Sequence, residues 1–309
     1  MTRIFFSTDV HGSERCWKKL VNAGKFYKAD LVILGGDITG KMVVPIVKQS
    51  DVKYRSDFLE RTEVLEEDQL NEHKTYVRNT GYYPYVCNQD ELKALEADRV
   101  GRDKLFSDLM IATLKDWIKF ADERLNNTDL KIYVCPGNDD RFDIDPLFEG
   151  ARSIVNAEGR VIYIDDCHEM ISSGWCNPTP WKTQREVSEE ELKSRIETQI
   201  TQVKDIKNCI FNLHSPPYGT LLDNAPHLVD LKPDLSKQDH VGSTAVYELI
   251  KKYQPLLGLH GHIHESKGKC QIGRTVCINP GSDYADGILA GYNIGLERGQ
   301  IKGLFPVSG

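Results

Sequence analysis

The sequence is organised around the stretch Leu259-His260-Gly261-His262-Ile263-His264. This stretch contains three of the 9 histidines of the 309-residue chain. Neutral imidazole is the commonest protein ligand of transition metals. The apolar residues 255–259 predict a short buried strand, and a sharp turn at Gly261 is expected to present His262 and His264 at its end. Taken alone, the stretch fits either a metal site or a polar edge strand whose histidines are satisfied internally.

The composition is typical of a soluble globular protein. Hydrophobic residues make up 40% and charged residues 28% of the chain, which is long enough to bury a full core. The formal net charge of -7 argues against broad electrostatic binding to nucleic acid or to an anionic membrane. No apolar run reaches the roughly 20 residues of a spanning helix. No signal peptide precedes the strand-like run at residues 3–6, so we expect a cytoplasmic protein.

The 8 cysteines are spread along the chain without a C-x-x-C pair. Several of them, including Cys135 and Cys209, lie inside apolar runs. This distribution indicates buried, reduced thiols rather than disulfides or a cysteine-based zinc site.

Four other predicted strands also end in polar residues. Residues 2–8, 31–34, 131–135 and 209–213 are short apolar runs, consistent with buried parallel strands. Ligands gather at the carboxyl ends of strands in open α/β sheets. Each aspartate alone would be explained by a helix N-cap or an Asx turn. Together, the five strand ends carry a set of candidate ligands: Asp9 and His11, Asp37, Asn138, His214, and His262 with His264.

These seven side chains offer four imidazole nitrogens, two carboxylates and one amide oxygen. That set suits two divalent ions that share a carboxylate and each keep a position open for water or substrate. Asp37 follows two glycines and therefore has room to contact both ions. Because these turns hold no cysteine, a closed structural zinc site is not expected.

The rest of the chain predicts covering helices and a series of late strands. Periodicity and capping residues predict helices at residues 13–23, 106–125, 188–203 and 244–253, and a hairpin at 160–164 and 168–172. Short alternating runs at 270–272, 275–278, 291–296 and 301–305 predict antiparallel strands that complete a second sheet.

Residues 41–103 interrupt this pattern and are predicted to form a helical insertion between two strands of the sheet. Residues 54–73 are acidic with a helical period, and the tyrosine-rich residues 82–85 are expected at a loop tip. Two interpretations of the insertion are open. It is either a cap over the site or a stabilising appendage whose tyrosines pack on its own helices.

The order of these motifs resembles the calcineurin-like metallophosphoesterase superfamily. The family's blocks D-x-H, G-D, G-N-x-[D/E], H and G-H-x-H correspond to residues 9–11, 36–37, 137–140, 214 and 261–264, each after an apolar run. The resemblance implies one α/β domain over residues 1–309, built as a four-layer α/β/β/α sandwich of two mixed sheets. It also implies two metal positions: one held by Asp9, His11, Asp37 and His264, the other by Asp37, Asn138, His214 and His262.

The resemblance further implies hydrolysis of a small-molecule phosphate ester, either a phosphodiester or an activated monoester. A hydroxide that bridges two divalent ions, manganese in preference to iron or zinc, would attack phosphorus while Asn138 and His214 place the phosphoryl oxygen. The family pattern assigns no metal to His260. Residues 279–282 resemble a family turn near the site, and we expect them to have a structural role in support of His262.

One residue departs from the family pattern. Asp139 stands where a histidine general acid is common, and an unperturbed carboxyl, with a pKa of about 3.9, is ionised at neutral pH. Asp139 could donate a proton only if desolvation or a like charge such as Asp140 raised its pKa. Otherwise a metal-bound water or His240 would serve, or no acid at all. We favour a role for Asp139 in orienting a ligand or backbone group, and a weak acid makes simple alkyl monoesters poor candidate substrates.

Two other classes of function compete with this interpretation. A metal-binding interaction scaffold of the same fold that has lost catalysis typically lacks ligands, whereas this chain has the full set. A metal-dependent amidohydrolase would open with H-x-H on its first strand and contain eight β/α units, whereas this chain opens with D-x-H.

Overall fold

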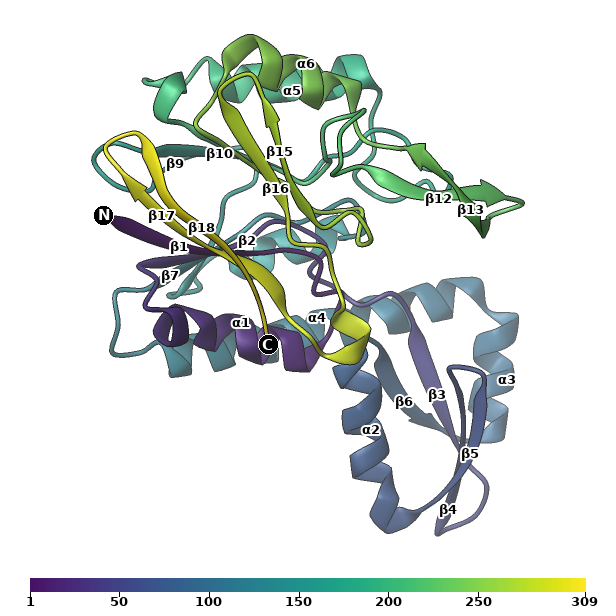
Figure 1. The fold of residues 1–309 in the computed structure, drawn as a ribbon. Coiled ribbons are helices and arrows are strands. Elements are labelled where there is room, and N and C mark those ends of the chain that lie inside the picture. The colour runs from purple at the N-terminus through teal and green to yellow at the C-terminus, as the bar shows by residue number, and fades with distance from the viewer.

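Two six-stranded sheets that lie face to face form the centre of the structure, a computed structural model that describes residues 1–309 (Figure 1). The first sheet has the strand order β18-β17-β1-β2-β7-β8. Its strands are β1 (Thr2–Ser7), β2 (Leu31–Leu34), β7 (Lys131–Val134), β8 (Ile154–Asn156), β17 (Ala290–Glu297) and β18 (Gln300–Ser308). The sheet is mixed, because β1, β2, β7 and β8 are parallel whereas β17 runs antiparallel to both β1 and β18.

The second sheet has the order β15-β16-β14-β11-β10-β9. Its strands are β9 (Val161–Tyr163), β10 (Glu169–Ser173), β11 (Ile210–Leu213), β14 (Leu257–Leu259), β15 (Gly268–Ile272) and β16 (Thr275–Asn279). The inner strands are parallel, and the edge strands β9 and β15 are antiparallel to their neighbours. The predicted hairpin, now β9 and β10, is therefore confirmed.

Helices cover the outer face of each sheet (Figure 1). The first sheet packs against α1 (Glu14–Tyr27) and α4 (Arg99–Arg124), and the second against α5 (Glu189–Ile200) and α6 (Thr244–Tyr253). Alternate side chains of β1 pack on opposite faces of the first sheet. Phe5 joins the cluster of α1 and α4, whereas Ile4 and Phe6 join the cluster between the sheets. Burial on both faces explains the continuous apolar runs, and the predicted α/β/β/α sandwich is confirmed.

Serines begin three of the covering helices. The side chains of Ser13, Ser188 and Ser243 each accept a hydrogen bond from a backbone N–H in the first turn of α1, α5 and α6. These three helix starts agree with the sequence-based prediction. The start of α4 does not, because Asp98 caps Val100 and begins the helix earlier than residue 106.

The prediction of a helical insertion at residues 41–103 is wrong, because this segment contains its own four-stranded sheet of order β5-β4-β3-β6. In Figure 1 the insertion projects from the sandwich. Residues 54–66 lie in a β-hairpin rather than a helix. Only Tyr54 and Ser56 of the first hairpin strand are buried. Because one of the two buried residues is a polar serine, the sequence lacks the alternation of apolar and polar residues that indicates a strand. The elements of the insertion are β3 (Val43–Lys48), β4 (Lys53–Phe58), β5 (Arg61–Glu66), α2 (Leu70–Asn79), β6 (Tyr83–Cys87) and α3 (Gln89–Ala97).

Residues 82–85 are not a loop tip, because they lead into β6, which pairs in parallel with β3. Tyr83 is buried, and its hydroxyl accepts a hydrogen bond of 2.8 Å from the backbone N–H of Gly40. Its ring packs edge-on against Phe106 of α4. These contacts join the insertion to the sandwich.

The prediction for the last four strands is half correct. β15 and β16 complete the second sheet as an antiparallel pair, but β17 and β18 join the edge of the first sheet beside β1. A further antiparallel hairpin, β12 (Asn224–Val229) and β13 (Lys232–His240), extends from the sandwich and was not predicted. Four 3-10 helices complete the chain: η1 (Glu67–Gln69), η2 (Phe142–Phe148), η3 (Ile206–Asn208) and η4 (Tyr284–Asp286). None of the helices combines the length and apolar composition that a membrane crossing requires.

Candidate metal centre

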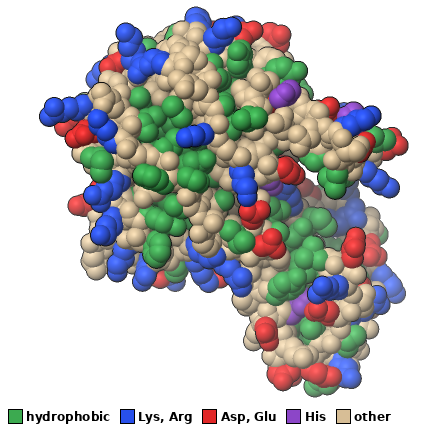
Figure 2. All heavy atoms as spheres, viewed as in Figure 1, with side chains coloured by type: hydrophobic (Ala, Val, Ile, Leu, Met, Phe, Trp, Pro, Cys, Tyr) green, Lys and Arg blue, Asp and Glu red, His purple; other side chains and the backbone are tan.

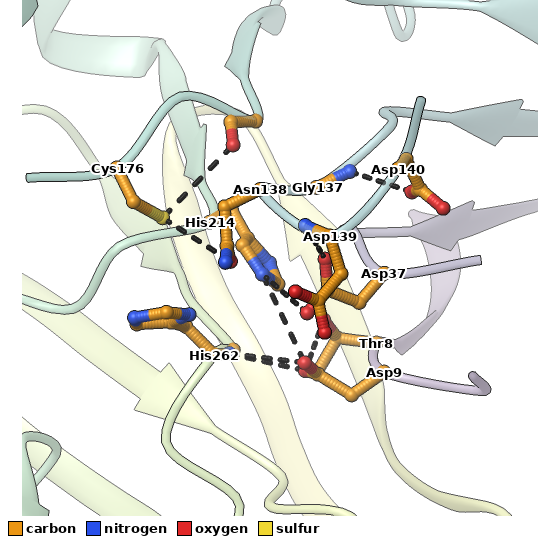
Figure 3. Close-up of polar contacts among 12 residues, drawn as sticks. Thr8, Asp9, Asp37, Gly137, Asn138, Asp139, Asp140, Cys176, His214 and His262 are labelled. Atoms are coloured by element: carbon orange, nitrogen blue, oxygen red, sulfur yellow. Dashed lines mark hydrogen bonds and ion pairs between the residues drawn. The ribbon is translucent and has the colours of Figure 1, made fainter. Parts of the chain in front are cut away.

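The turns that follow β1, β2, β7, β11 and β14 bring the predicted ligands together. Figure 3 shows five of them: Asp9, Asp37, Asn138, His214 and His262. Four of the predicted ligands adopt left-handed backbone conformations, which are uncommon for residues other than glycine: Asp9 (φ 54°), His11 (φ 39°), Asp37 (φ 49°) and His262 (φ 67°). Such strained residues concentrate at functional sites, where the surrounding structure holds them in place.

Two glycines allow the turns to approach one another this closely. Gly36 has a φ of 145°, and a Cβ there would lie 2.1 Å from Nδ1 of His214. A Cβ on Gly261 would lie 2.4 Å from the Asp9 carboxylate and 2.2 Å from the Thr8 hydroxyl. The expected sharp turn is present, closed by a hydrogen bond of 2.7 Å from the Ile263 N–H to the Gly261 carbonyl oxygen, and Gly261 itself is needed for close packing against Asp9.

The first group of donor atoms comes from Asp9, His11 and His264. The Nε2 atoms of the two histidines are 3.0 Å apart, and Oδ1 of Asp9 is 3.3 Å from Nε2 of His264 and 3.7 Å from Nε2 of His11. Asp9 is held in this position because its carboxylate accepts hydrogen bonds from the hydroxyl of Thr8 and the backbone N–H of His262.

Asp37 lies between this group and a second one. Its Oδ2 is 3.5 Å from Nε2 of His11 and 3.4 Å from Nε2 of His214. On the far side, the donor atoms of His214, His262 and Cys176 lie within 4.8 Å of one another. Asn138 joins this second group, because its Oδ1 is 3.7 Å from the Cys176 sulfur while its Nδ2 donates to the Thr183 hydroxyl.

These residues fit divalent ions. Asp9 and Asp37 are each only 2% exposed, and two carboxylates buried side by side need positive charge near them. Nε2 of His214 is buried without a hydrogen-bond partner, while Nδ1 of the same ring lies 3.1 Å from the Gly35 carbonyl oxygen. A ring held through one nitrogen, with the other directed at carboxylates, is the usual arrangement of a metal-binding histidine.

The electrostatics of the site also leave lone pairs free for a metal on His11 and His262, whereas, against the effect of burial, Asp9 raises the pKa of His264. Burial lowers the pKa of His11 to about 3 and that of His262 to about 4, so both rings are neutral at physiological pH. His214 differs. Burial opposes its positive charge, but the carboxylates of Asp37 and Asp9 raise its pKa to about 9. An ion bound there would have to replace a proton on His214.

Asp139 lies at the edge of this centre with its side chain turned toward Lys41. Its backbone N–H donates a hydrogen bond of 3.0 Å to Oδ1 of Asp37, and its Oδ2 is 3.1 Å from Nζ of Lys41. Burial and the charge of Asp37 raise the pKa of Asp139. The like charge suggested from the sequence, Asp140, is therefore the wrong one.

Asp140 instead connects the turn after β2 to the turn after β7. Its buried carboxylate accepts hydrogen bonds from the backbone N–H groups of Ile38, Thr39 and Gly137 and from the Thr39 hydroxyl. These bonds fix the turn that carries Asp37 relative to the turn that carries Asn138. Burial and the charge of Asp37 raise the pKa of Asp140 to about 6, so it remains largely ionised at neutral pH.

Replacing Asp140 with Asn should lower the free energy of unfolding of the metal-free protein by about 2 kcal/mol, because the amide group would face N–H donors and leave some of them unsatisfied. Relief of a buried charge offsets part of this loss. Urea unfolding at pH 7 measures the effect, with Asp139→Asn as the matched control. Equal stability of the two variants would contradict this role of Asp140.

Three further residues named in the sequence analysis, His240, His260 and Asn279, lie around this centre rather than among its donor atoms. His240 lies at the end of β13, pairs with Asp223 at 2.8 Å and belongs to none of the donor groups, and its role as an acid stays a prediction. Nδ1 of His260 lies 2.8 Å from the Leu213 carbonyl oxygen, away from the centre, as a strand-end residue would. Asn279 donates to the carbonyl oxygens of Gly261 and Ile263, and so supports the backbone around His262 as predicted.

Sequence reasoning missed three residues at this site. Lys41 was assigned to the insertion, Tyr284 packs its ring 4.8 Å from that of His11, and Cys176 lies in a loop after β10. Lys41 and Cys176 follow no recognisable motif. Tyr284 comes shortly after the turn at residues 279–282, which was the one available signal.

Known proteins share part of the sequence of this chain and, at low sequence identity, its fold. No family model matches the chain. The uncharacterized protein MJ1162 of Methanocaldococcus jannaschii is 31% identical over 153 residues, which are 49% of this chain and 64% of that protein, so less than two thirds of the relative is covered. One crystal structure aligns over 94% of both chains with a TM-score of 0.56 and 16% identity. The crystal structure of TT1561 of Thermus thermophilus aligns over 94% of this chain and 93% of its own, with a TM-score of 0.51 and 13% identity.

Proposed function

We propose that this chain is a dinuclear-metal phosphoesterase of the calcineurin-like metallophosphoesterase superfamily, and that it hydrolyses a phosphodiester or an activated phosphate monoester. One observation supports this most directly. Oδ2 of Asp37 lies 3.5 Å from the donor nitrogen of His11 and 3.4 Å from that of His214, which places a single carboxylate between two groups of donors. A shared carboxylate is what a pair of neighbouring ions requires.

Each donor group has a distinct composition. Asp9, His11, Asp37 and His264 would hold one ion, and Asp37, Asn138, His214 and His262 the other. When bound, two divalent ions supply an activated water and neutralise the charge that develops on the phosphoryl oxygens. Thr183 fixes the Asn138 amide so that its carbonyl oxygen faces the site, and the Asp139 backbone N–H orients Asp37.

A pocket of about 240 Å³ beside Asp139 would take the leaving group. Its lining combines the insertion and the sandwich: Lys41, Asp103, Phe106, Asp139, Arg141, Thr183 and Gln184. Figure 2 shows the molecule hollowed between the β12–β13 hairpin and the insertion, with charged side chains at the edge. The insertion contributes only its two end residues, Lys41 and Asp103, to this pocket, and the interpretation of the insertion as a cap over the site stays a prediction.

Asp139 would act through its neighbours rather than as a general acid. Its carboxylate pairs with Lys41, and its backbone N–H holds Asp37, so both groups are already engaged. Without a dedicated acid, hydrolysis favours substrates whose leaving oxygen is stable as an anion, such as aryl or anhydride-like esters.

The function is tested by stripping the full chain of metals, reloading it with manganese or zinc, and measuring turnover of nitrophenyl phosphodiester and monoester. We expect metal-dependent release of nitrophenolate. A chain that binds two ions per molecule and turns over neither ester would instead be a catalytically silent scaffold of the same fold.

Lys41 gives a further expected result. Replacing Lys41 with Met should raise the KM for the nitrophenyl phosphodiester about tenfold, equivalent to about 1.4 kcal/mol, because the partly buried ammonium would attract the phosphoryl anion. Lys48→Met is a matched control, since both lysine side chains are 43% exposed and Lys48 pairs only with the exposed Asp51. The same KM in both variants would remove Lys41 from substrate binding.

A further inference from the structure

Cys176 is a buried thiol whose position the backbone fixes. It follows β10, and its backbone N–H donates to the Arg185 carbonyl oxygen at 2.9 Å while its own carbonyl oxygen accepts from Val187 at 3.0 Å. The side chain is fully buried and points toward Asn138 (Figure 3). The protein holds its sulfur at the edge of the second donor group.

The distances around this sulfur match those between ligands of one ion. The sulfur is 3.7 Å from Oδ1 of Asn138, and it lies within 4.8 Å of the donor nitrogens of His214 and His262. Zinc–sulfur and zinc–oxygen bonds of about 2.3 and 2.1 Å at a tetrahedral angle place the two donor atoms about 3.6 Å apart.

A second observation, on His214, also points to an ion at this place. Nε2 of His214 is buried, has no hydrogen-bond partner and is directed into the same group of atoms. The sulfur and this nitrogen therefore share one small space. An ion at this place would contact the sulfur, the Asn138 oxygen and the buried nitrogen of His214 together, which an S–H hydrogen bond to Asn138 alone would not.

We propose that Cys176 is a further metal ligand, at the position formed by Asn138, His214 and His262. The inference rests on the proposed dinuclear centre. On coordination the S–H bond breaks, the proton leaves to water, and the thiolate forms the bond to the ion without any change of oxidation state.

This ligand would make the two metal positions unequal. The position at Asp9, His11 and His264 offers only nitrogen and oxygen donors, which manganese accepts. A thiolate at the other position selects zinc, cobalt or iron over manganese. The manganese preference expected from the sequence would then apply to the first position alone.

The test is the absorption spectrum of the full chain loaded with two equivalents of cobalt, with the metal content measured separately. We expect a sulfur-to-cobalt charge-transfer band in the near ultraviolet. Cys176→Ser should lose the band but keep two cobalt ions, and its preference for zinc over manganese in competition should fall at least tenfold. Cys209→Ser, a buried cysteine within the α5 and α6 cluster, should retain the band.

Two bound cobalt ions without the band in the unaltered chain would overturn the role of Cys176 and leave the dinuclear centre intact. A band that persists in Cys176→Ser would do the same. A chain that binds no cobalt would overturn the proposed centre as well. X-ray absorption of the zinc-loaded unaltered chain, which should show sulfur at about 2.3 Å, decides the question even if the serine variant does not fold.

Discussion

Replacing Asp37 with Asn should lower kcat/KM for a nitrophenyl phosphodiester by about 10³-fold or more and weaken metal binding at both positions. The carboxylate lies within 3.5 Å of the donor nitrogens of both His11 and His214, so its charge serves both ions. An asparagine keeps the shape but offers one neutral oxygen, which cannot bind two cations with comparable strength. A loss of about 4 kcal/mol in transition-state stabilisation corresponds to that factor.

The measurement is steady-state turnover together with metal content after dialysis. Asp51→Asn, at a fully exposed carboxylate in the insertion, is the matched control and should change neither quantity. Circular dichroism checks that the variant is folded. An Asp37→Asn protein that retains turnover, or that loses only one of the two ions, would refute the assignment of Asp37 as a shared ligand.

The sandwich was implied by the resemblance of the motifs to a known superfamily, whereas the buried strands and the convergence of their turns were predictable for a physical reason. Buried parallel strands must be apolar on both faces, so β1 and β2 stand out as unbroken runs, and the polar residues that follow them mark the strand ends. Because parallel strands end at one edge of a sheet, Asp9 and Asp37 had to lie near each other. No long-range information was needed for that step.

Other features depend on contacts that no local pattern encodes. The strand character of β4 comes from pairing with β3 and β5, while its own sequence alternates charge with a tyrosine and a serine. Lys41 and Cys176 reach the centre only because the chain returns there after β2 and after β10. Asp139 and Asp140 are neighbours in sequence, yet one faces the site and the other holds the turns beneath it.

Chelation of the metals should abolish turnover, and reloading should raise the Tm more at pH 9 than at pH 6.5. In the metal-free chain burial opposes a charge on His214, but Asp37 and Asp9 raise its pKa from 6.5 to about 9. A histidine whose pKa is raised by folding contributes stability that is complete below pH 6.5 and is lost as the pH rises through about 9. The metal-free chain should therefore lose up to about 3 kcal/mol across this window.

A bound ion removes this dependence, because it occupies Nε2 of His214 in place of the proton and satisfies the carboxylates at either pH. At about a hundredfold excess over Kd each ion adds about 2.7 kcal/mol, and each kcal/mol shifts the Tm by about 2–3 °C. Thermal melts of chelated and reloaded protein at both pH values measure the difference. His214→Gln should abolish it, whereas His240→Gln, which pairs with Asp223 outside the centre, should preserve it. A metal-induced rise in Tm that is equal at both pH values would mean that no ion displaces the proton of His214.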